Sequence, residues 1–239
     1  MSANKPTVNK SFSVKTFAIG RENEQIIVID DFMEDAEDLV RYATEHSDFY
    51  KENKAGNYYP GVRLPPPAGY FDAVYGALRP VLESVFNIST DMCLVKAESS
   101  LSLVTLRPDE LNDLQCLPHF DTADPNQYAL LHYLCRTPHQ GTSFYRHNFT
   151  GYEIISDERF DSYTQAYMED LELNGPPEKA YILNSNERYT KIGSVAAEFN
   201  RIVIYRSCLL HSADIASEVS INADPATGRL TANTFVGLC

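Results

Sequence analysis

Apolar residues follow one spacing in the first part of the chain and another in the rest, with the change near residue 100. They recur at helical spacing from 34 to 45 and again from 68 to 86, where Pro80 lies inside the pattern. Two earlier runs, 12–17 and 25–29, are typical of strands. We therefore expect the N-terminal part to supply two strands and two supporting helices.

From residue 101 onward the apolar residues come in short runs of the kind that strands show. These runs span 101–106, 128–135, 141–146, 180–183, 201–205, 209–213 and 228–237, and a shorter one spans 93–95. A helical pattern interrupts them near 158–173. The proline-rich stretch 58–67 predicts an irregular crossing, either a substrate-facing loop or an ordered surface connection. Strands at this spacing predict a mainly β fold with supporting α-helices, a sandwich or barrel.

Composition favours one globular domain. With 44% hydrophobic residues the chain can bury a substantial core, and no low-complexity linker divides it, so we expect residues 1–239 to form a single domain. The formal net charge of -13 argues against a nucleic-acid partner and against a polybasic membrane anchor. Residues 1–10 lack an apolar signal core, and no run approaches about 18 apolar residues, so we expect a cytoplasmic protein with no membrane partner.

Several common kinds of site are missing from the sequence. The five cysteines are odd in number, widely spaced and without a C-x-x-C pair, which predicts free thiols rather than disulfides or structural zinc. No Gly-rich phosphate loop and no G-x-S-x-G elbow occurs. Histidines and carboxylates are therefore the remaining candidates for chemistry.

One His-x-Asp motif stands among the predicted strands. In a β-strand successive side chains alternate, so His119 and Asp121 would share one side and Phe120 would turn away. With His211, which follows an apolar run, they would form a 2-His-1-carboxylate facial triad that leaves about three positions of an octahedral Fe(II) open. We predict these three residues as metal ligands and catalytic residues.

The motif alone has a plainer interpretation. Chance gives about 0.4 His-x-Asp matches in a chain of this composition, and this chain has two. The second, His46 with Asp48, ends a helical pattern, where residues two apart diverge by about 200°. His119 and Asp121 could instead form a surface pair near a turn, and His211 could cap a turn.

The order of these parts resembles the double-stranded β-helix, or jelly roll, of the Fe(II)/2-oxoglutarate-dependent dioxygenases. The His119-Phe120-Asp121 motif is followed by the apolar run 128–134 and then by 141–145, which resembles the glycine-led strand after the first ligands in that superfamily. Residues 201–211 resemble the strand and turn that carry the distal histidine, and 228–235 resemble the closing strand. The resemblance covers 101–237 and is closest to the prolyl-hydroxylase-like branch and an uncharacterised bacterial family within it.

This resemblance implies the cofactors and the roles of further residues. Fe(II) would be the metal, 2-oxoglutarate and O2 the co-substrates, and ascorbate a candidate addition. Arg229 would hold the distal carboxylate of 2-oxoglutarate through two parallel donors, and Thr231 would share its face. Tyr133 is the candidate tyrosine for the co-substrate, with Tyr128 as the alternative. The plain alternatives are a solvated strand residue for Arg229 and an ordinary strand residue for Thr231.

The resemblance implies a hydroxylase that converts 2-oxoglutarate to succinate while it oxidises a small molecule or a peptide side chain. The retained Asp121 argues for oxygen rather than halide transfer, because halogenating relatives carry a small residue there. Two alternatives belong to other classes: a non-catalytic cupin-like protein that binds a metal or small molecule, and a metal-free structural or interaction domain. For His132, inside an apolar run, we predict a satisfied core histidine rather than a ligand.

Overall fold

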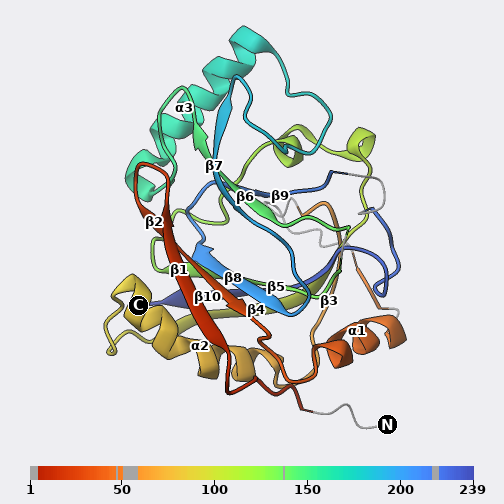
Figure 1. Cartoon of the computed structure of the whole chain (residues 1–239). Coiled ribbons are helices and arrows are strands. Elements are labelled where there is room, and N and C mark those ends of the chain that lie inside the picture. Colours follow the sequence, from red (N-terminus) through yellow and green to blue (C-terminus); the bar gives the residue numbers. More distant parts are fainter. Residues whose placement is uncertain (1–4, 47, 51–58, 137, 217–220) are drawn as a thin grey trace.

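Two antiparallel β-sheets face each other, with helices outside them, in the computed structural model, which describes residues 5–46, 48–50, 59–136, 138–216 and 221–239 (Figure 1). The larger sheet has seven strands and the smaller has three. Within the described residues no helix is both long and apolar enough to cross a membrane. The fold is therefore mainly β with supporting helices, as the strand spacing predicted.

The helices and strands are, in chain order, β1 Ser13–Ile19, β2 Glu24–Asp30, α1 Ala36–Glu45, β3 Gly61–Leu64, α2 Tyr70–Phe86, β4 Leu94–Val104, the 3-10 helices η1 Pro108–Glu110 and η2 Asp113–Cys116, β5 Gln127–Tyr133, β6 Thr142–His147, α3 Asp157–Asn174, β7 Tyr189–Val195, β8 Arg201–Arg206, β9 His211–Ala213 and β10 Leu230–Leu238. In the larger sheet the strands lie in the order β1-β2-β8-β5-β10-β4-β3, and in the smaller sheet in the order β7-β6-β9. Strands from both halves of the chain therefore share the larger sheet.

The first core layer lies between the larger sheet and helices α1 and α2 (Figure 1). Val74, Leu78 and Leu82 recur every four residues on α2, so they share one face and are completely buried. Leu101 and Leu103 of β4 alternate with polar neighbours and pack into the same layer. This layer fixes one face of the larger sheet and leaves the other for the smaller sheet.

The second core layer lies between the two sheets. Phe144 of β6 packs edge-on against Tyr205 of β8, with ring centroids 5.1 Å apart. Helix α3 lies beside β7 (Figure 1), and Ala166 is its only buried residue in the described structure. Most of α3 is therefore held from one side only.

The three helices lie where the sequence predicts them, but two strands do not. Residues 180–183, predicted as a strand, form none, and the smaller sheet ends instead in β7, in which only Tyr189 and Val195 are buried. Residues 61–64, expected within an irregular crossing that begins at Tyr58, form β3, and Tyr58 itself lies outside the described residues. Both β3 and β7 are edge strands, which need little hydrophobicity because one side has no partner strand.

The segment that carries the His-x-Asp motif is also different from a regular strand. It begins with η2, which Asn112 caps by accepting a hydrogen bond from the N–H of Gln115 at 3.0 Å. Pro118 then offers no N–H, so a continuous ladder cannot form before His119. Within the described residues the motif joins no named strand and pairs through an isolated bridge at His119 and one further backbone hydrogen bond at Asp121.

His132 is a satisfied core histidine, as predicted. Its Nε2–H donates to Oδ1 of Asn200 at 3.1 Å, and its Nδ1 accepts from the hydroxyl of Tyr70 at 3.1 Å. The orientation of the Asn200 amide follows from its two bonds to the backbone of Met33. A neutral imidazole uses both nitrogens in this way, and burial lowers the pKa of His132 to about 4.

The stability of the protein should fall as the pH drops from 6.5 towards 4, in part because His132 binds a proton in the unfolded chain but not in the folded one. At pH 5 the contribution of this imidazole is about 2 kcal/mol. A His132→Gln variant should be less stable than the wild type at pH 7 and should lose about that much less stability on acidification. Urea unfolding at pH 7 and pH 5 measures this, with the exposed His46→Gln as control, and equal losses in all three proteins would contradict it.

Candidate metal centre

A backbone bridge joins two segments that are far apart in the sequence. The N–H of His119 donates to the carbonyl of His211 at 2.9 Å, and the N–H of His211 donates back to the carbonyl of His119 at 2.8 Å. The N–H of Asp121 donates to the carbonyl of Ser207 at 2.8 Å. Side chains that face each other across an antiparallel bridge project to the same side, so the two imidazoles lie together, with ring centroids 4.3 Å apart.

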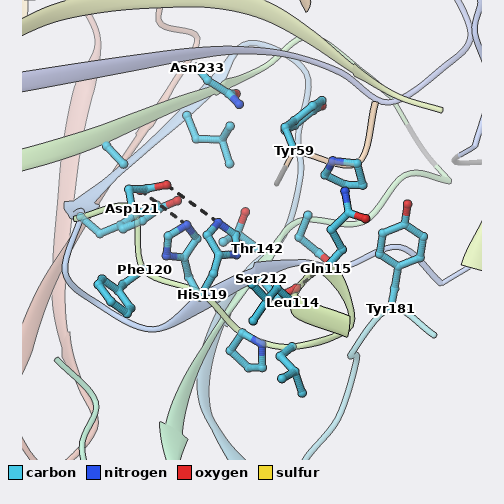
Figure 2. Close-up of a pocket in the computed structure, with 18 of the residues that line it drawn as sticks. Tyr59, Leu114, Gln115, His119, Phe120, Asp121, Thr142, Tyr181, Ser212 and Asn233 are labelled. Carbon is cyan, nitrogen blue, oxygen red and sulfur yellow. Dashed lines mark hydrogen bonds and ion pairs between the residues drawn. The ribbon is translucent and has the colours of Figure 1, made fainter. Parts of the chain in front are cut away.

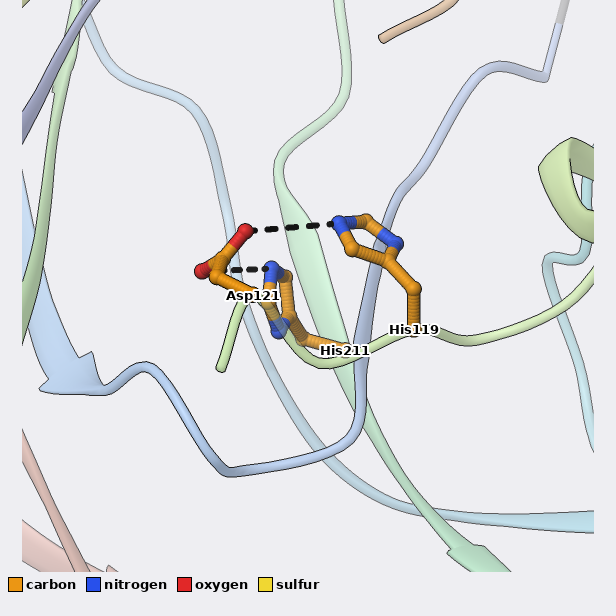
Figure 3. Close-up of side chains that lie close together, drawn as sticks. All are labelled: His119, Asp121 and His211. Atoms are coloured by element: carbon orange, nitrogen blue, oxygen red, sulfur yellow. Dashed lines mark ion pairs between the residues drawn. The ribbon is translucent and has the colours of Figure 1, made fainter. Parts of the chain in front are cut away.

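The three predicted ligands meet at one point (Figure 3). One carboxylate oxygen of Asp121 lies 3.8 Å from Nε2 of His119, and the other lies 3.7 Å from Nε2 of His211. One ligand atom from each residue lies within 4.8 Å of the others, which is close enough for all three to hold one metal ion. Phe120 turns away, and its ring meets that of Tyr163 on α3 edge-on at 5.9 Å. The two ligands of the motif thus share one side, as strand alternation predicted.

The tautomer of His211 suits metal binding. Its Nδ1 lies 2.8 Å from the carbonyl oxygen of Leu209, which can only accept, so Nδ1 carries the proton and donates it. Nε2 therefore keeps its lone pair, and this is the nitrogen that faces Asp121. A backbone carbonyl that orients a ligand imidazole in this way is a common support of metal sites.

Burial holds both imidazoles in the neutral form that binds metals. It lowers the pKa of His211, whose side chain is 7% exposed, to about 4. The pKa of His119 also falls to about 4, through loss of water and the nearby His211, although 52% of the side chain remains open towards the pocket. Burial raises the pKa of Asp121 above its usual value, against the opposing effect of His119. A partly covered carboxylate between neutral imidazoles is stabilised by a cation.

The triad lies in a pocket between the sheets with a volume of about 520 Å³ (Figure 2). Pockets that hold small molecules measure roughly 300–1,000 Å³. The larger sheet supplies the floor through β5, β8 and β10, and the smaller sheet contributes β9. Helix α3 and the segment with Tyr181 line further parts of the wall. The site is therefore large enough for a co-substrate and a further small group.

Arg229 lines the same pocket and is 2% exposed. Its Nε donates to the carbonyl of Gln140 at 3.1 Å, and its Nη2 donates to the carbonyl of Gly141 at 2.8 Å. No carboxylate of the described residues forms an ion pair with it. A Cβ at Gly141 would come within 1.7 Å of the carbonyl oxygen of Val195, so only glycine permits this approach. The result is a buried, anchored cation that forms no direct ion pair with the described residues, although the carboxylate of Asp214 lies near enough for the charge of Arg229 to oppose the rise in its pKa that burial causes.

The other predicted co-substrate residues have different positions. Thr231 is completely buried and lines the pocket, where its hydroxyl lies beside that of Tyr59. Tyr133 lies behind the pocket lining, where its hydroxyl donates to Oγ1 of Thr142 at 2.7 Å. Tyr128 points to the opposite face of the sheet and packs against Phe86 of α2, with ring centroids 4.8 Å apart. Arg229 and Thr231 therefore share the pocket with the triad, and the two tyrosines do not line it.

Two pocket residues were missed in the sequence. Tyr205 of β8 packs against His211, with ring centroids 4.8 Å apart, and burial together with the charge of Asp121 holds the pKa of its hydroxyl well above the usual value. Asn233 of β10 points into the pocket (Figure 2). Asn233 lies two residues after Thr231, so both side chains lie on the same face of β10. This spacing was the one signal in the sequence that could have identified Asn233 as a pocket residue.

Solved structures show only weak likenesses to this chain. HygX from Streptomyces hygroscopicus with nickel, 2-oxoglutarate and hygromycin B bound has a TM-score of 0.44 and 14% identity, over 90% of this chain and 84% of that chain. HygX with nickel and 2-oxoglutarate bound has a TM-score of 0.44 and 13% identity, with the same coverage. An N-substituted L-amino acid dioxygenase from Burkholderia ambifaria AMMD has a TM-score of 0.38 and 13% identity, over 91% of this chain and 82% of that chain. Likenesses at these TM-scores carry no conclusion about function.

No curated protein matches the chain. A described protein family does match, over residues 10–236, which include every residue of the candidate centre and Arg229. The chain therefore belongs to the family of unknown function DUF6445.

Proposed function

We propose that this protein is an Fe(II)/2-oxoglutarate-dependent dioxygenase that hydroxylates a small molecule or a peptide side chain and releases succinate. One observation carries this: a single pocket contains both the cluster of His119, Asp121 and His211 and the buried guanidinium of Arg229. A metal ion fits the first, and the free carboxylate of a co-substrate bound to that ion fits the second.

The connectivity of the strands supports a double-stranded β-helix. From β4 the chain passes to the bridge at His119, then through β5, β6, β7, β8, β9 and β10. These eight segments, from β4 to β10 with the bridge at His119 as the second, can be numbered 1 to 8. In the larger sheet four of them are neighbours in the order 6-3-8-1, flanked by β1, β2 and β3. In the smaller sheet, with the bridged segment placed beside β9, the order is 5-4-7-2. This alternation between two sheets is the pattern of a jelly roll made of two Greek keys.

The donor set favours iron over a hard cation. Two imidazoles and one carboxylate suit a divalent transition metal, whereas Mg²⁺ and Ca²⁺ prefer oxygen ligands throughout. Three protein ligands leave about three coordination positions for other groups. Bound Fe(II), with 2-oxoglutarate and O2, would supply the oxidising chemistry.

The residues of the chain would orient the co-substrate and exclude water. Arg229 would donate two parallel hydrogen bonds to the distal carboxylate of 2-oxoglutarate, and Thr231 would add a hydroxyl donor from the same face. A buried cation without a partner is costly, so an anion that pairs with it is bound strongly. Tyr205 stays neutral and covers the ring of His211, so it keeps water from this ligand without adding charge.

Metal binding is the first test. The purified protein should bind one Co(II) or Fe(II) per chain under anaerobic conditions, measured by metal analysis and by the visible spectrum of cobalt. His211→Ala and Asp121→Ala should weaken binding by more than about 100-fold, since loss of a supporting partner alone costs about 10- to 100-fold. His46→Ala removes the other His-x-Asp motif and should bind metal like the wild type. A protein with no stoichiometric metal would instead be a structural or interaction domain.

Co-substrate binding is the second test. With metal present, 2-oxoglutarate at about 100 times its Kd should stabilise the wild type by about 2.7 kcal/mol, seen as a rise in Tm. Arg229→Met should keep the metal and lose this rise, and Arg229→Lys, which retains the charge but not the paired donors, should keep part of it. Succinate release in the presence of Fe(II), 2-oxoglutarate and ascorbate then tests turnover. A non-catalytic cupin-like protein would release none above background with any substrate pool, and Arg229→Ala would leave its ligand binding unchanged.

A further inference from the structure

One wall of the pocket is a stripe of side chains on α3. Phe160, Tyr163, Thr164 and Tyr167 occupy positions i, i+3, i+4 and i+7 of the helix, and all four line the pocket. A stripe at this spacing on a helix with a single buried residue is usually its core-facing side. On α3 the stripe faces the cavity, so three aromatic rings are available to a ligand.

The stripe packs edge-on against Phe120 through both Tyr163 and Phe160 and is partly open elsewhere. The ring of Tyr163 meets Phe120, the residue between the two ligands of the motif, edge-on at 5.9 Å. The hydroxyl of Tyr163 pairs with that of Tyr189 at 3.1 Å. Phe160 leaves 45% of its surface open, and the hydroxyl of Tyr167 forms no hydrogen bond with the described residues. Among the described residues, nine Tyr or Phe side chains line the pocket, so a flat ring would find aromatic partners in the same pocket as the triad.

The floor of the pocket holds an amide that lacks a partner. Oδ1 of Asn233 is buried, and the side chain makes no hydrogen bond with any described residue. It points from β10 towards the space above the triad in Figure 2. A side-chain amide presents a donor and an acceptor next to each other, which is complementary to another amide. A ligand amide would therefore satisfy a group that the folded protein leaves incomplete.

The charges of the pocket disfavour a cationic ligand. Asp121 is the only carboxylate among the described residues that line it, and the proposed metal would use this group. The other charged side chains of the described lining are the guanidiniums of Arg63 and Arg229. A positively charged substrate would therefore lack an acidic partner and would meet cations.

We propose that the substrate carries an uncharged aromatic ring next to an amide group, with the ring on the α3 stripe and the amide on Asn233. This inference rests on the proposed function for its chemistry, whereas binding of the substrate needs only the pocket. An aromatic residue within a peptide and a free aromatic amide share this chemistry.

The probe is N-acetyl-L-phenylalaninamide, with the matched β-cyclohexylalanine compound as control, because the two share size and amide and differ in aromaticity. Calorimetry should find saturable binding of the aromatic probe and binding about two- to tenfold weaker for the control. Measurements with Ni(II) and 2-oxoglutarate and with metal-free protein separate the two proposals. If the protein binds no metal but still binds the probe, only the proposed function fails. The peptide Gly-Gly-Phe-Gly-Gly distinguishes the sources: tighter binding assigns a peptide substrate, and weaker binding assigns a free amide.

Variants of α3 test the stripe. Tyr167→Leu should weaken the aromatic probe at least threefold and remove its advantage over the cyclohexyl compound. Met168→Leu changes the neighbouring residue, which is 53% exposed and does not line the pocket, and should bind both compounds like the wild type. No saturable binding of either aromatic probe, or equal affinity for phenyl and cyclohexyl groups in the wild type, would overturn the inference.

Asn233→Leu tests the proposed contact between Asn233 and the amide of the ligand. The readout is a combination of Tm and probe affinity that a purely structural role of Asn233 would not produce. It removes a buried polar group without a partner, so Tm should rise while probe affinity falls about tenfold and the effect of 2-oxoglutarate on Tm stays the same. Tyr70→Phe removes a hydrogen bond on the opposite face of the sheet, so it should lower Tm and leave binding unchanged. Unchanged probe affinity in Asn233→Leu, or a lost response to 2-oxoglutarate, would assign Asn233 to another role and end the proposal.

Discussion

The candidate centre depends on the two backbone hydrogen bonds between His119 and His211. They bring together two segments that are far apart in the sequence and place both imidazoles on the same side of the bridge, independently of the neighbouring side chains. Because the bonds are made by the backbone, the ligand nitrogens are positioned before any metal arrives. Asp121 is fixed in the same way through Ser207, so the triad is preorganised by the sheet rather than by the ion.

The pocket joins two charged groups that are each incomplete alone. Asp121 is a partly covered carboxylate with a raised pKa, and Arg229 is a buried guanidinium that donates to two carbonyl oxygens and lies over the ring of Tyr133. Each would be stabilised by an ion of opposite charge, and a metal with a dicarboxylate provides both. The chain as a whole carries a net charge of -13, so the buried guanidinium is a local exception that gives an anion a defined place to bind.

The elements on the two sides of the pocket differ in how much of their surface is buried. The larger sheet is packed on one face by α1 and α2 and carries the floor of the pocket, including Thr231 and Asn233, on the other. Helix α3 has one buried residue and lines the pocket with Tyr163 and Tyr167. The candidate centre thus lies on well-packed strands, and the wall formed by α3 belongs to an element that contributes little to the core.

Local patterns in the sequence determined the three helices, the buried state of His132 and the shared side of His119 and Asp121, because helical spacing and alternation follow from backbone geometry alone. They missed the edge strands β3 and β7, whose residues bury too little apolar surface to form a pattern. Only the tertiary structure decided that His211 lies opposite His119, that Tyr133 is turned behind the pocket, and that Asn233 faces into it. These depend on strand pairing and on which face of a sheet meets another layer, and long-range register leaves no signal in the spacing of neighbouring residues.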